Sequence, residues 1–303
     1  MSTPPLVSIG FPVYNGEASM RRALDSILAQ DFQDFEVIIA DNASTDETKS
    51  ISEAYAARDR RIRYIRNETN IGANPNHDLV FNKSRGRFFA WAAHDIEQLP
   101  GMLSRCVKEM ESVPQPPVLV YPRCELVGDT GMPADFIQAS IASSDPRAYR
   151  RLHTVIHNIV FVTQHYGLFD AAALRKTRLN GSYAASDYVL TAELAMLGEI
   201  REVPAVLLRR TIDQSRGTVA VIHDKKKWAA WTAPQKRRCL SFVPVRERLA
   251  FEYLRSAWYL PLSPADKLGC MIVGPLAPYW KVVLRVTGPV RHKVRKFFRS
   301  LPR

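Results

Sequence analysis

The sequence has few of the features that are typical of secreted proteins, of proteins stabilised by a structural metal ion, or of membrane-spanning proteins. Its cysteines, Cys106, Cys124, Cys239 and Cys270, are scattered, and no pair has the spacing of zinc ligands. Isolated thiols of this kind are typical of a reducing compartment rather than of a disulfide framework. The N-terminal residues lack a basic stretch followed by an apolar core, so we expect no signal peptide. No apolar run reaches the ~20 residues of a bilayer-spanning helix.

Acidic residues are missing from the C-terminal end of the chain. None follows Asp266, and the region beyond it contains these basic residues: Lys281, Arg285, Arg291, Lys293, Arg295, Lys296, Arg299 and Arg303. The apolar stretch from Leu268 to Leu284 is interrupted by glycine, proline and lysine. This pattern is typical of a segment that lies on an anionic membrane surface, and a solvated basic tail is the alternative. The whole chain has a net charge of +12, which predicts an anionic partner.

Strand and helix patterns alternate over residues 6–122. Hydrophobic residues make up 46% of the chain, enough for a sizeable core. Short apolar runs, which predict buried strands, occupy residues 6–11, 35–40, 62–65, 88–93 and 118–121. Helical patterns separate these runs, and short strand–helix alternation is the signature of a mainly parallel α/β sheet. The alternation weakens over residues 124–147, which we expect to be a loop, and further helices are predicted near residues 149–162, 188–197 and 246–259.

The stretch from Gly86 to Pro100 is the clearest single feature. An apolar strand runs directly into His94, Asp95 and Glu97, and Pro100 is expected to start the next helix. In open α/β sheets, ligands bind beyond the carboxyl ends of the strands, where an Asp can hold a hard cation against a phosphate. A cap of the next turn is the alternative role for Asp95.

Polar residues also follow the first two strands. Tyr14 comes after the first strand, and Asp41 ends the second. If the strands are parallel, these side chains converge on one edge of the sheet with Asp95. Asp41 could instead be only a turn or cap residue, and the segment from Ser44 to Glu47 has the pattern of a capping box.

An ordered series of motifs resembles the family 2 glycosyltransferases, which have the GT-A fold. The series comprises Val7–Gly16, Asp41–Asp46, Asn70–Gly72 with Asn76, Arg85–Gly86, His94–Asp95 and Ser186–Asp187. It covers about residues 6–215. The resemblance implies a Rossmann-like, three-layer α/β sandwich with a mainly parallel central sheet, followed by a helical, basic C-terminal extension.

The resemblance also implies roles for individual residues. Asp187 matches the catalytic base, with helix capping as its alternative role. Asp95 matches the acid that holds a divalent metal, Mn²⁺ or Mg²⁺, against the donor diphosphate. The expected nucleotide-sugar-binding residues are Pro12, Tyr14, Glu17, Asp41, Asn70, Gly72, His94, Asp95 and Arg210. Among them, Asp41 matches the acid that hydrogen-bonds the base, and His94 has a structural role as its alternative.

Three positions depart from the family pattern and weaken the expected metal site. Ala93 replaces the first acid of the D-x-D motif, Ile96 replaces an acid that often follows it, and Thr211 replaces a histidine. Arginines at 209, 210 and 216 could then carry more of the diphosphate charge.

We therefore expect an inverting, metal-dependent transferase that moves a sugar, with UDP-sugars favoured, to a hydroxyl of a cell-surface glycan or glycolipid precursor. The expected domains are a catalytic domain over residues 1–215, with a nucleotide-sugar half over 6–122 and an acceptor half over 123–215, and a basic helical region over 216–303. Residues 268–303 are expected to contact an anionic membrane, placing the protein at the cytoplasmic face. A nucleotide-sugar-binding protein with impaired catalysis is one alternative. Nucleic-acid binding through the basic region is another, and we do not expect it.

Overall fold

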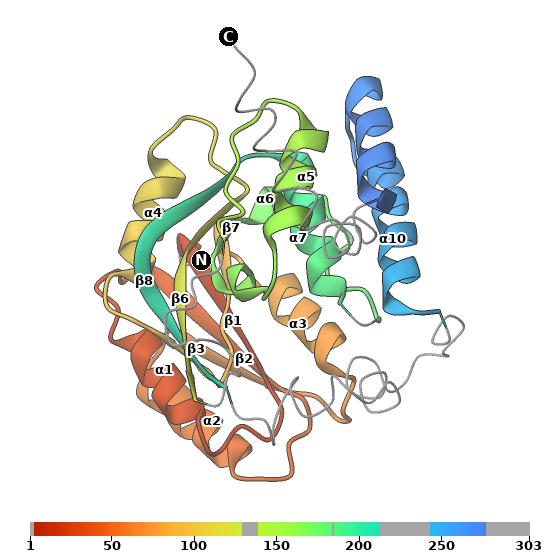
Figure 1. The fold of residues 1–303 in the computed structure, drawn as a ribbon. Helices are drawn as coiled ribbons and strands as arrows, with labels where there is room; N and C mark the ends of the chain where they lie inside the picture. The colour runs from red at the N-terminus through yellow and green to blue at the C-terminus, as the bar shows by residue number, and fades with distance from the viewer. Residues whose placement is uncertain (1–2, 129–138, 184, 213–242, 277–303) are drawn as a thin grey trace.

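The computed structural model describes residues 3–128, 139–183, 185–212 and 243–276. Strands are present in this part of the chain with these bounds: β1 Val7–Val13, β2 Phe35–Asp41, β3 Ile62–Arg66, β4 Phe88–Trp91, β5 Ile96–Gln98, β6 Leu119–Gly128, β7 Leu168–Asp170 and β8 Ile200–Ile212. They form one sheet in the order β3-β2-β1-β4-β7-β6-β8-β5 (Figure 1). Most strands are parallel, whereas β7 is antiparallel to β4 and β6, and β5 is antiparallel to β8. The predicted α/β fold with a mainly parallel sheet is confirmed.

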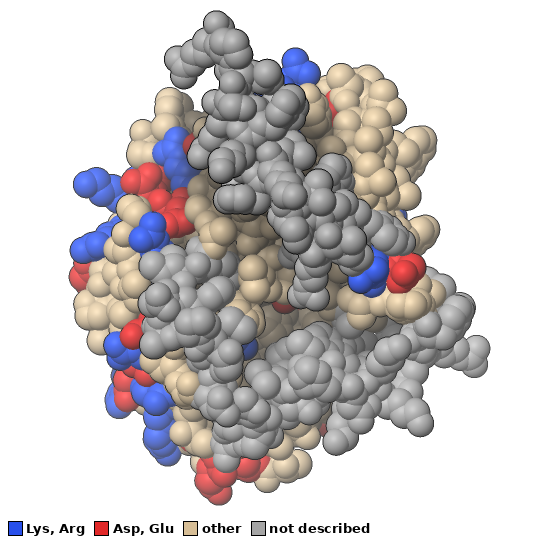
Figure 2. All heavy atoms as spheres, in the orientation of Figure 1, with Lys and Arg blue, Asp and Glu red and all other residues tan. Residues whose placement is uncertain are grey.

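Helices cover both faces of this sheet. Their bounds are α1 Met20–Leu28, α2 Thr48–Arg58, α3 Ala73–Asn82, α4 Met102–Glu111, α5 Ala148–Asn158, α6 Ala171–Leu174, α7 Ser186–Leu197 and α10 Val245–Tyr259, with a short 3₁₀ helix η1 at Thr163–Tyr166. Figure 1 shows α1, α2 and α4 on one side of the sheet and α3, α5 and α7 on the other, with α10 outside α7. In Figure 2, basic and acidic side chains intermingle along the side of the molecule where α1, α2 and α4 lie.

Neighbouring residues of each central strand enter different cores, because side chains alternate across a strand. Phe88 and Ala90 join the cluster under α1, α2 and α4. Phe89 and Trp91 join the cluster under α3, α5 and α7. This two-sided burial explains why the strand reads as an unbroken apolar run rather than as an alternating pattern.

The first strand contains a glycine that the close approach of α3 requires and a proline that its neighbouring strands tolerate. A Cβ on Gly10 would lie 2.5 Å from Cγ2 of Val80, so α3 could not approach β1 as closely beside a larger residue. The sequence pattern predicts a strand over residues 6–11, but β1 continues through Val13 and includes Pro12. Pro12 is tolerated there because the β4 ladder on its side has already ended at the pair Gly10–Trp91.

Three local predictions are wrong. The strand predicted over residues 88–93 ends at Trp91, and the short strand β5 follows before α4. The start of the expected loop over residues 124–147 is strand, because β6 continues to Gly128 beside β8. The expected capping box is absent: Oδ1 of Asp46 accepts from the Thr48 amide at 3.0 Å, and Ser44 instead accepts from the Asn15 amide.

The C-terminal helices pack on the outside of α5 and α7. Tyr253 and Ala257 of α10 join Cys270 in a third hydrophobic cluster with side chains of α5 and α7. Residues 264–276 form another helix, and Asp266 on it accepts from the Ala148 amide at the start of α5. None of the helices that the structure describes is long and apolar enough to cross a membrane. The predictions for Arg216 and for residues 277–303 fall outside the described residues.

Candidate functional site at the carboxyl edge of the sheet

The predicted polar residues lie where β1, β2 and β4 end. The backbone of this edge is continuous, because the Asn42 amide donates to the Val13 carbonyl at 2.8 Å and the Ala92 amide donates to the Gly10 carbonyl at 2.8 Å. The loops that leave the three strands therefore start side by side. Parallel strands place their carboxyl ends on one edge, which is where α/β sheets bind ligands.

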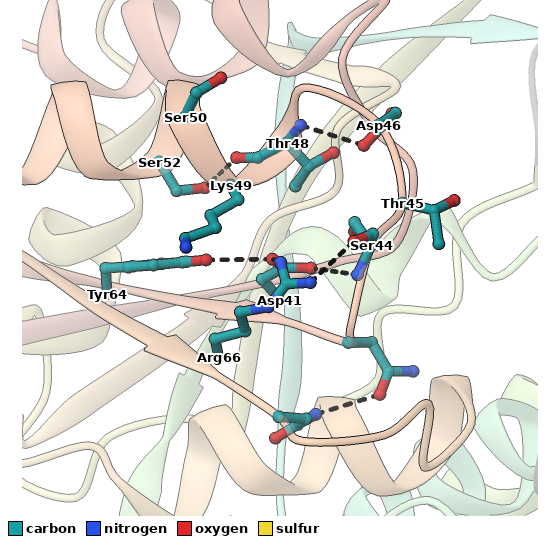
Figure 3. A network of polar contacts seen from close by, with 12 residues as sticks. Asp41, Ser44, Thr45, Asp46, Thr48, Lys49, Ser50, Ser52, Tyr64 and Arg66 are labelled. Atoms are coloured by element: carbon teal, nitrogen blue, oxygen red, sulfur yellow. Dashed lines mark hydrogen bonds and ion pairs between the residues drawn. The ribbon is translucent and has the colours of Figure 1, made fainter.

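Asp41 is the centre of a polar network at this edge. Its side chain is fully buried; Oδ1 accepts from the Ser44 amide at 2.8 Å, and Oδ2 accepts from the Tyr64 hydroxyl at 3.0 Å and from Arg66. Figure 3 shows Tyr64 and Arg66 reaching Asp41 from β3. Arg66 also donates to the Ser44 carbonyl at 2.9 Å, so Asp41 and Arg66 together set the path of the chain after β2.

The loop after β1 is bound to the loop after β2. Oε2 of Glu17 accepts from the Glu47 amide at 2.9 Å, while the Glu17 amide donates to Asp46 at 3.1 Å. The Gly16 amide donates to Thr48 at 2.8 Å. Glu17 therefore holds two loops together, and Tyr14, in the same loop, is 42% exposed.

Asn70 and Gly72 lie beside Asp41 through an asparagine network. Oδ1 of Asn70 accepts from Asn42 and from the Gly72 amide, each at 2.9 Å. Gly72 precedes α3 with a φ of 93°, a left-handed conformation that favours glycine. Helix α3 then reaches across to α7, because Asn74 donates to the Ser186 hydroxyl at 2.9 Å.

Asp95 pairs with an arginine from β8. Nε of Arg210 donates to Oδ2 of Asp95 at 3.1 Å, and the Thr211 amide donates to the Asp95 carbonyl at 3.0 Å. Asp95 therefore does not cap a helix. His94, next to it, has Nδ1 at 2.8 Å from the Ser19 hydroxyl, which ties this turn to the loop after β1.

Asp187 lies in the first turn of α7, near the Asp95–Arg210 pair. The N-cap position of α7 is Ala185, so Asp187 is not the cap that the sequence offered as an alternative. Burial raises the pKa of Asp187 to about 6, against the lowering effects of the Tyr188 amide and the Arg210 charge. A carboxylate with this pKa is ionised at neutral pH but still basic enough to accept a proton.

Tyr166 joins these groups, and no motif in the sequence identified it. The Arg210 guanidinium carbon lies 6.0 Å from the centre of the Tyr166 ring. Burial raises the pKa of Tyr166 to about 12, with the charge of Arg210 lowering it and those of Asp95 and Asp187 raising it. The charged groups of Asp95, Asp187 and Arg210 thus all lie within electrostatic range of Tyr166.

The site has two parts on one edge of the sheet. Asp41, Glu17, Asn70 and Gly72 form the first, and Asp95, Asp187 and Arg210 form the second. His94 connects them through Ser19, and Pro12 lies in the strand below. Sequence reasoning also missed Tyr64 and Arg66, whose i, i+2 spacing on β3 indicates a shared face but not that Asp41 is opposite.

The donor set at Asp95 does not fit a metal ion held by the protein. The described residues contain no group of three or more His, Cys, Asp or Glu side chains that could hold one. Glu97, the nearest further acid in sequence, has Oε1 at 2.7 Å from Nε of Arg22. Ile96 is buried in the hydrophobic core, and the Thr211 hydroxyl accepts from Arg22 at 3.0 Å.

Comparisons with known proteins agree with the fold and identify the family. The family model described as Glycosyl transferase family 2 matches residues 8–178. An uncharacterized glycosyltransferase of Rickettsia typhi is 25% identical over 77% of this chain and 72% of its own length. A GalNAc(5)-diNAcBac-PP-undecaprenol beta-1,3-glucosyltransferase of Campylobacter jejuni is 33% identical over 35% of this chain and 34% of its own. The chain spans about half or less of the length of several other curated relatives.

Two solved structures share the fold. TarS 1-349 of S. aureus, in complex with UDP-GlcNAc, has a TM-score of 0.61 and 17% identity, covering 88% of this chain and 70% of that chain. The mannosyltransferase PcManGT of Pyrobaculum calidifontis, in complex with GDP-Man and Mn²⁺, has a TM-score of 0.54 and 18% identity, covering 98% of this chain and 84% of that one. At these identities, the likeness concerns the fold alone.

Proposed function

The chain belongs to glycosyl transferase family 2, and on that premise we propose that it transfers a sugar from a nucleoside-diphosphate donor to a hydroxyl group, with inversion at the anomeric carbon. The observation that carries the proposal is Asp187, a carboxylate with a pKa of about 6 close to the Asp95–Arg210 pair. UDP-sugars are the favoured donors. Supporting this choice, a structural neighbour was solved with UDP-GlcNAc.

Asp187 has the properties of a general base in this reaction. It takes the proton of the acceptor hydroxyl while that oxygen bonds to the anomeric carbon from the face opposite the diphosphate. The bond from the anomeric carbon to the diphosphate oxygen breaks in the same step, and the electron pair leaves with the diphosphate. One displacement inverts the centre without a covalent enzyme intermediate.

The two parts of the site divide donor binding between them. The Asp41 part, with Glu17, Asn70 and Gly72, is assigned to the nucleoside, and the Asp95 part is assigned to the diphosphate. The Asp41 carboxylate already accepts hydrogen bonds from Tyr64 and Arg66. Recognition of the nucleotide base would therefore involve those two side chains as well. The family resemblance implies a divalent ion at Asp95, but the donor set supplies no second carboxylate to hold it.

The acceptor assigned here is a glycan or glycolipid precursor at an anionic membrane surface. In support, Trp258 is 72% exposed at the end of α10, beside Tyr259. On the helix over 264–276, Leu268, Ile272 and Leu276 are exposed at intervals of four residues, so they share one face. Aromatic and aliphatic side chains next to a basic stretch suit the interface of an anionic bilayer. The similar protein of Campylobacter jejuni is named for an undecaprenol-linked acceptor.

A screen of nucleotide-sugars with mass detection of products tests the function. Asp187→Asn should abolish transfer while UDP binding, measured by titration calorimetry, persists. Asp170→Asn is the matched control, because Asp170 caps α6 by accepting from the Ala172 amide and lies at the opposite end of β4, paired with Phe88. Loss of UDP binding in Asp187→Asn would indicate a structural aspartate. Binding without transfer in the wild type would favour the catalytically impaired alternative.

A further inference from the structure

Strand β8 delivers Arg210 to the position where the family pattern places a metal ion. Arg210 is paired with Ile96 in the antiparallel β5–β8 ladder, and the Thr211 amide donates to the Asp95 carbonyl. The strand pairing at Arg210 and the backbone hydrogen bond at Thr211 thus hold Arg210 beside Asp95. The sequence also offered Arg209 for the diphosphate, but its side chain points to the other side of the strand, where it pairs with Glu125 at 2.8 Å.

The groups that a metal ion would use already contact cations. Asp95 contacts Arg210, and Glu97 contacts Arg22 at 2.7 Å. Thr211, at the position of the family's histidine, accepts from the same Arg22. A divalent ion at Asp95 would therefore have to displace the Arg210 ion pair or stand beside a fixed positive charge.

The guanidinium of Arg210 has the chemistry that a diphosphate requires. Its side chain is only 18% exposed, and its pKa is raised by Tyr166 and Asp95 despite burial, so it stays charged throughout the working pH range. The hydrogen bond to Asp95 uses Nε of the Arg210 guanidinium. The edge formed by its two Nη atoms takes no part in this bond and can face a phosphate. A planar fork binds phosphate oxygens in pairs, which the point charge of a lysine cannot do.

We propose that this protein binds its donor diphosphate without a divalent metal ion, with the guanidinium of Arg210 supplying the positive charge and Asp95 holding that guanidinium in place. The proposal rests on the donor function given above. It assigns Asp95 as a positioning residue for Arg210 rather than as a metal ligand.

Titration calorimetry with UDP and with GDP, in EDTA and in MnCl₂, tests the proposal on the full chain. The wild type should bind one of the two nucleotides with the same affinity in both buffers, within about twofold. Arg210→Ala should weaken binding about ten- to a hundredfold, as expected for lost charge-assisted hydrogen bonds. Arg210→Lys should lie between the two, because it keeps the charge and loses the fork. Arg209→Ala, with its exposed pair on the other side of β8, should bind as the wild type does.

Each outcome decides the proposal. An increase in wild-type affinity of more than about tenfold with Mn²⁺ would overturn it and leave the transferase function standing. Equal losses in Arg209→Ala and Arg210→Ala would also overturn it, because a general charge effect would then explain both. No binding of either nucleotide in either buffer would overturn the donor function and this proposal together. If Arg210→Ala fails to fold, shown by circular dichroism, the wild-type comparison and Arg210→Lys still decide.

Discussion

The pH dependence of sugar transfer is the sharpest test of Asp187. Burial raises its pKa from 3.8 to about 6, and this shift corresponds to a cost of about 3 kcal/mol for ionising the carboxyl group. A general base acts only when ionised, so kcat/KM should fall on the acid side with its midpoint near the pKa of the free enzyme. At about pH 5, roughly a tenth of the Asp187 carboxyls would be ionised, against about nine-tenths for an aspartate of ordinary pKa.

Removing the Arg210 charge should change the pH at which the acid limb of the kcat/KM profile lies. The Arg210 charge lowers the pKa of Asp187, so Arg210→Ala should move the limb of kcat/KM to higher pH. Arg209→Ala, whose partner is Glu125, should leave the limb where it is. Asp187→Asn should lower kcat/KM about 10²- to 10⁴-fold, the range attributed to a general base.

The assay is the initial rate of product formation from a nucleotide-sugar, followed by mass spectrometry at constant ionic strength. Circular dichroism at each pH separates loss of activity from unfolding. A wild-type limb centred near pH 4 would refute the reasoning, because it would show an Asp187 of ordinary pKa or a different base. An Asp187→Asn variant that keeps full activity would refute it as well.

Three further predictions concern stability and the membrane. Gly10→Ala should lower the free energy of unfolding by about 1–3 kcal/mol in chemical denaturation, because its Cβ would meet Val80; an unchanged value would mean that α3 shifts freely. Arg178→Met should cost about 3–5 kcal/mol, since it removes the cation beside the buried Glu193 carboxylate, while Glu252 keeps its pair with Arg248; Arg58→Met, at an exposed pair with Asp25, should cost under about 1 kcal/mol. Equal costs for these two arginines would contradict the argument from burial. The double variant Trp258→Ala and Tyr259→Ala should reduce co-sedimentation with phosphatidylglycerol vesicles, and Val160→Ala, an exposed apolar residue elsewhere, should not. Undiminished sedimentation of the double variant would place the contact elsewhere.

Local patterns predicted the first half of the fold well. The strands at Val7, Phe35 and Phe88 are buried on both faces, so each reads as a continuous apolar run. Their parallel order follows from the helices between them. The C-terminal helix near residue 246 was also predictable from its pattern, and α10 begins at Val245.

Non-local pairing was not predictable in the same way. Strand β5 has only three residues and exists because β8 pairs with it in an antiparallel register. The extension of β6 to Gly128 depends on the same partner strand. Neither segment has enough residues or a regular enough pattern to identify it without its neighbour.

The sequence by itself determined which groups reach the carboxyl edge of the sheet, because a parallel α/β pattern places Asp41 and Asp95 at strand ends. It also singled out Asp187, through its likeness to a family motif. Tertiary structure alone decided what these acids contact. The β2–β3 register puts Arg66 against Asp41, and the β5–β8 register puts Arg210 beside Asp95. The reason is physical: strand periodicity sets the face on which a side chain lies, but register between distant strands sets its partner.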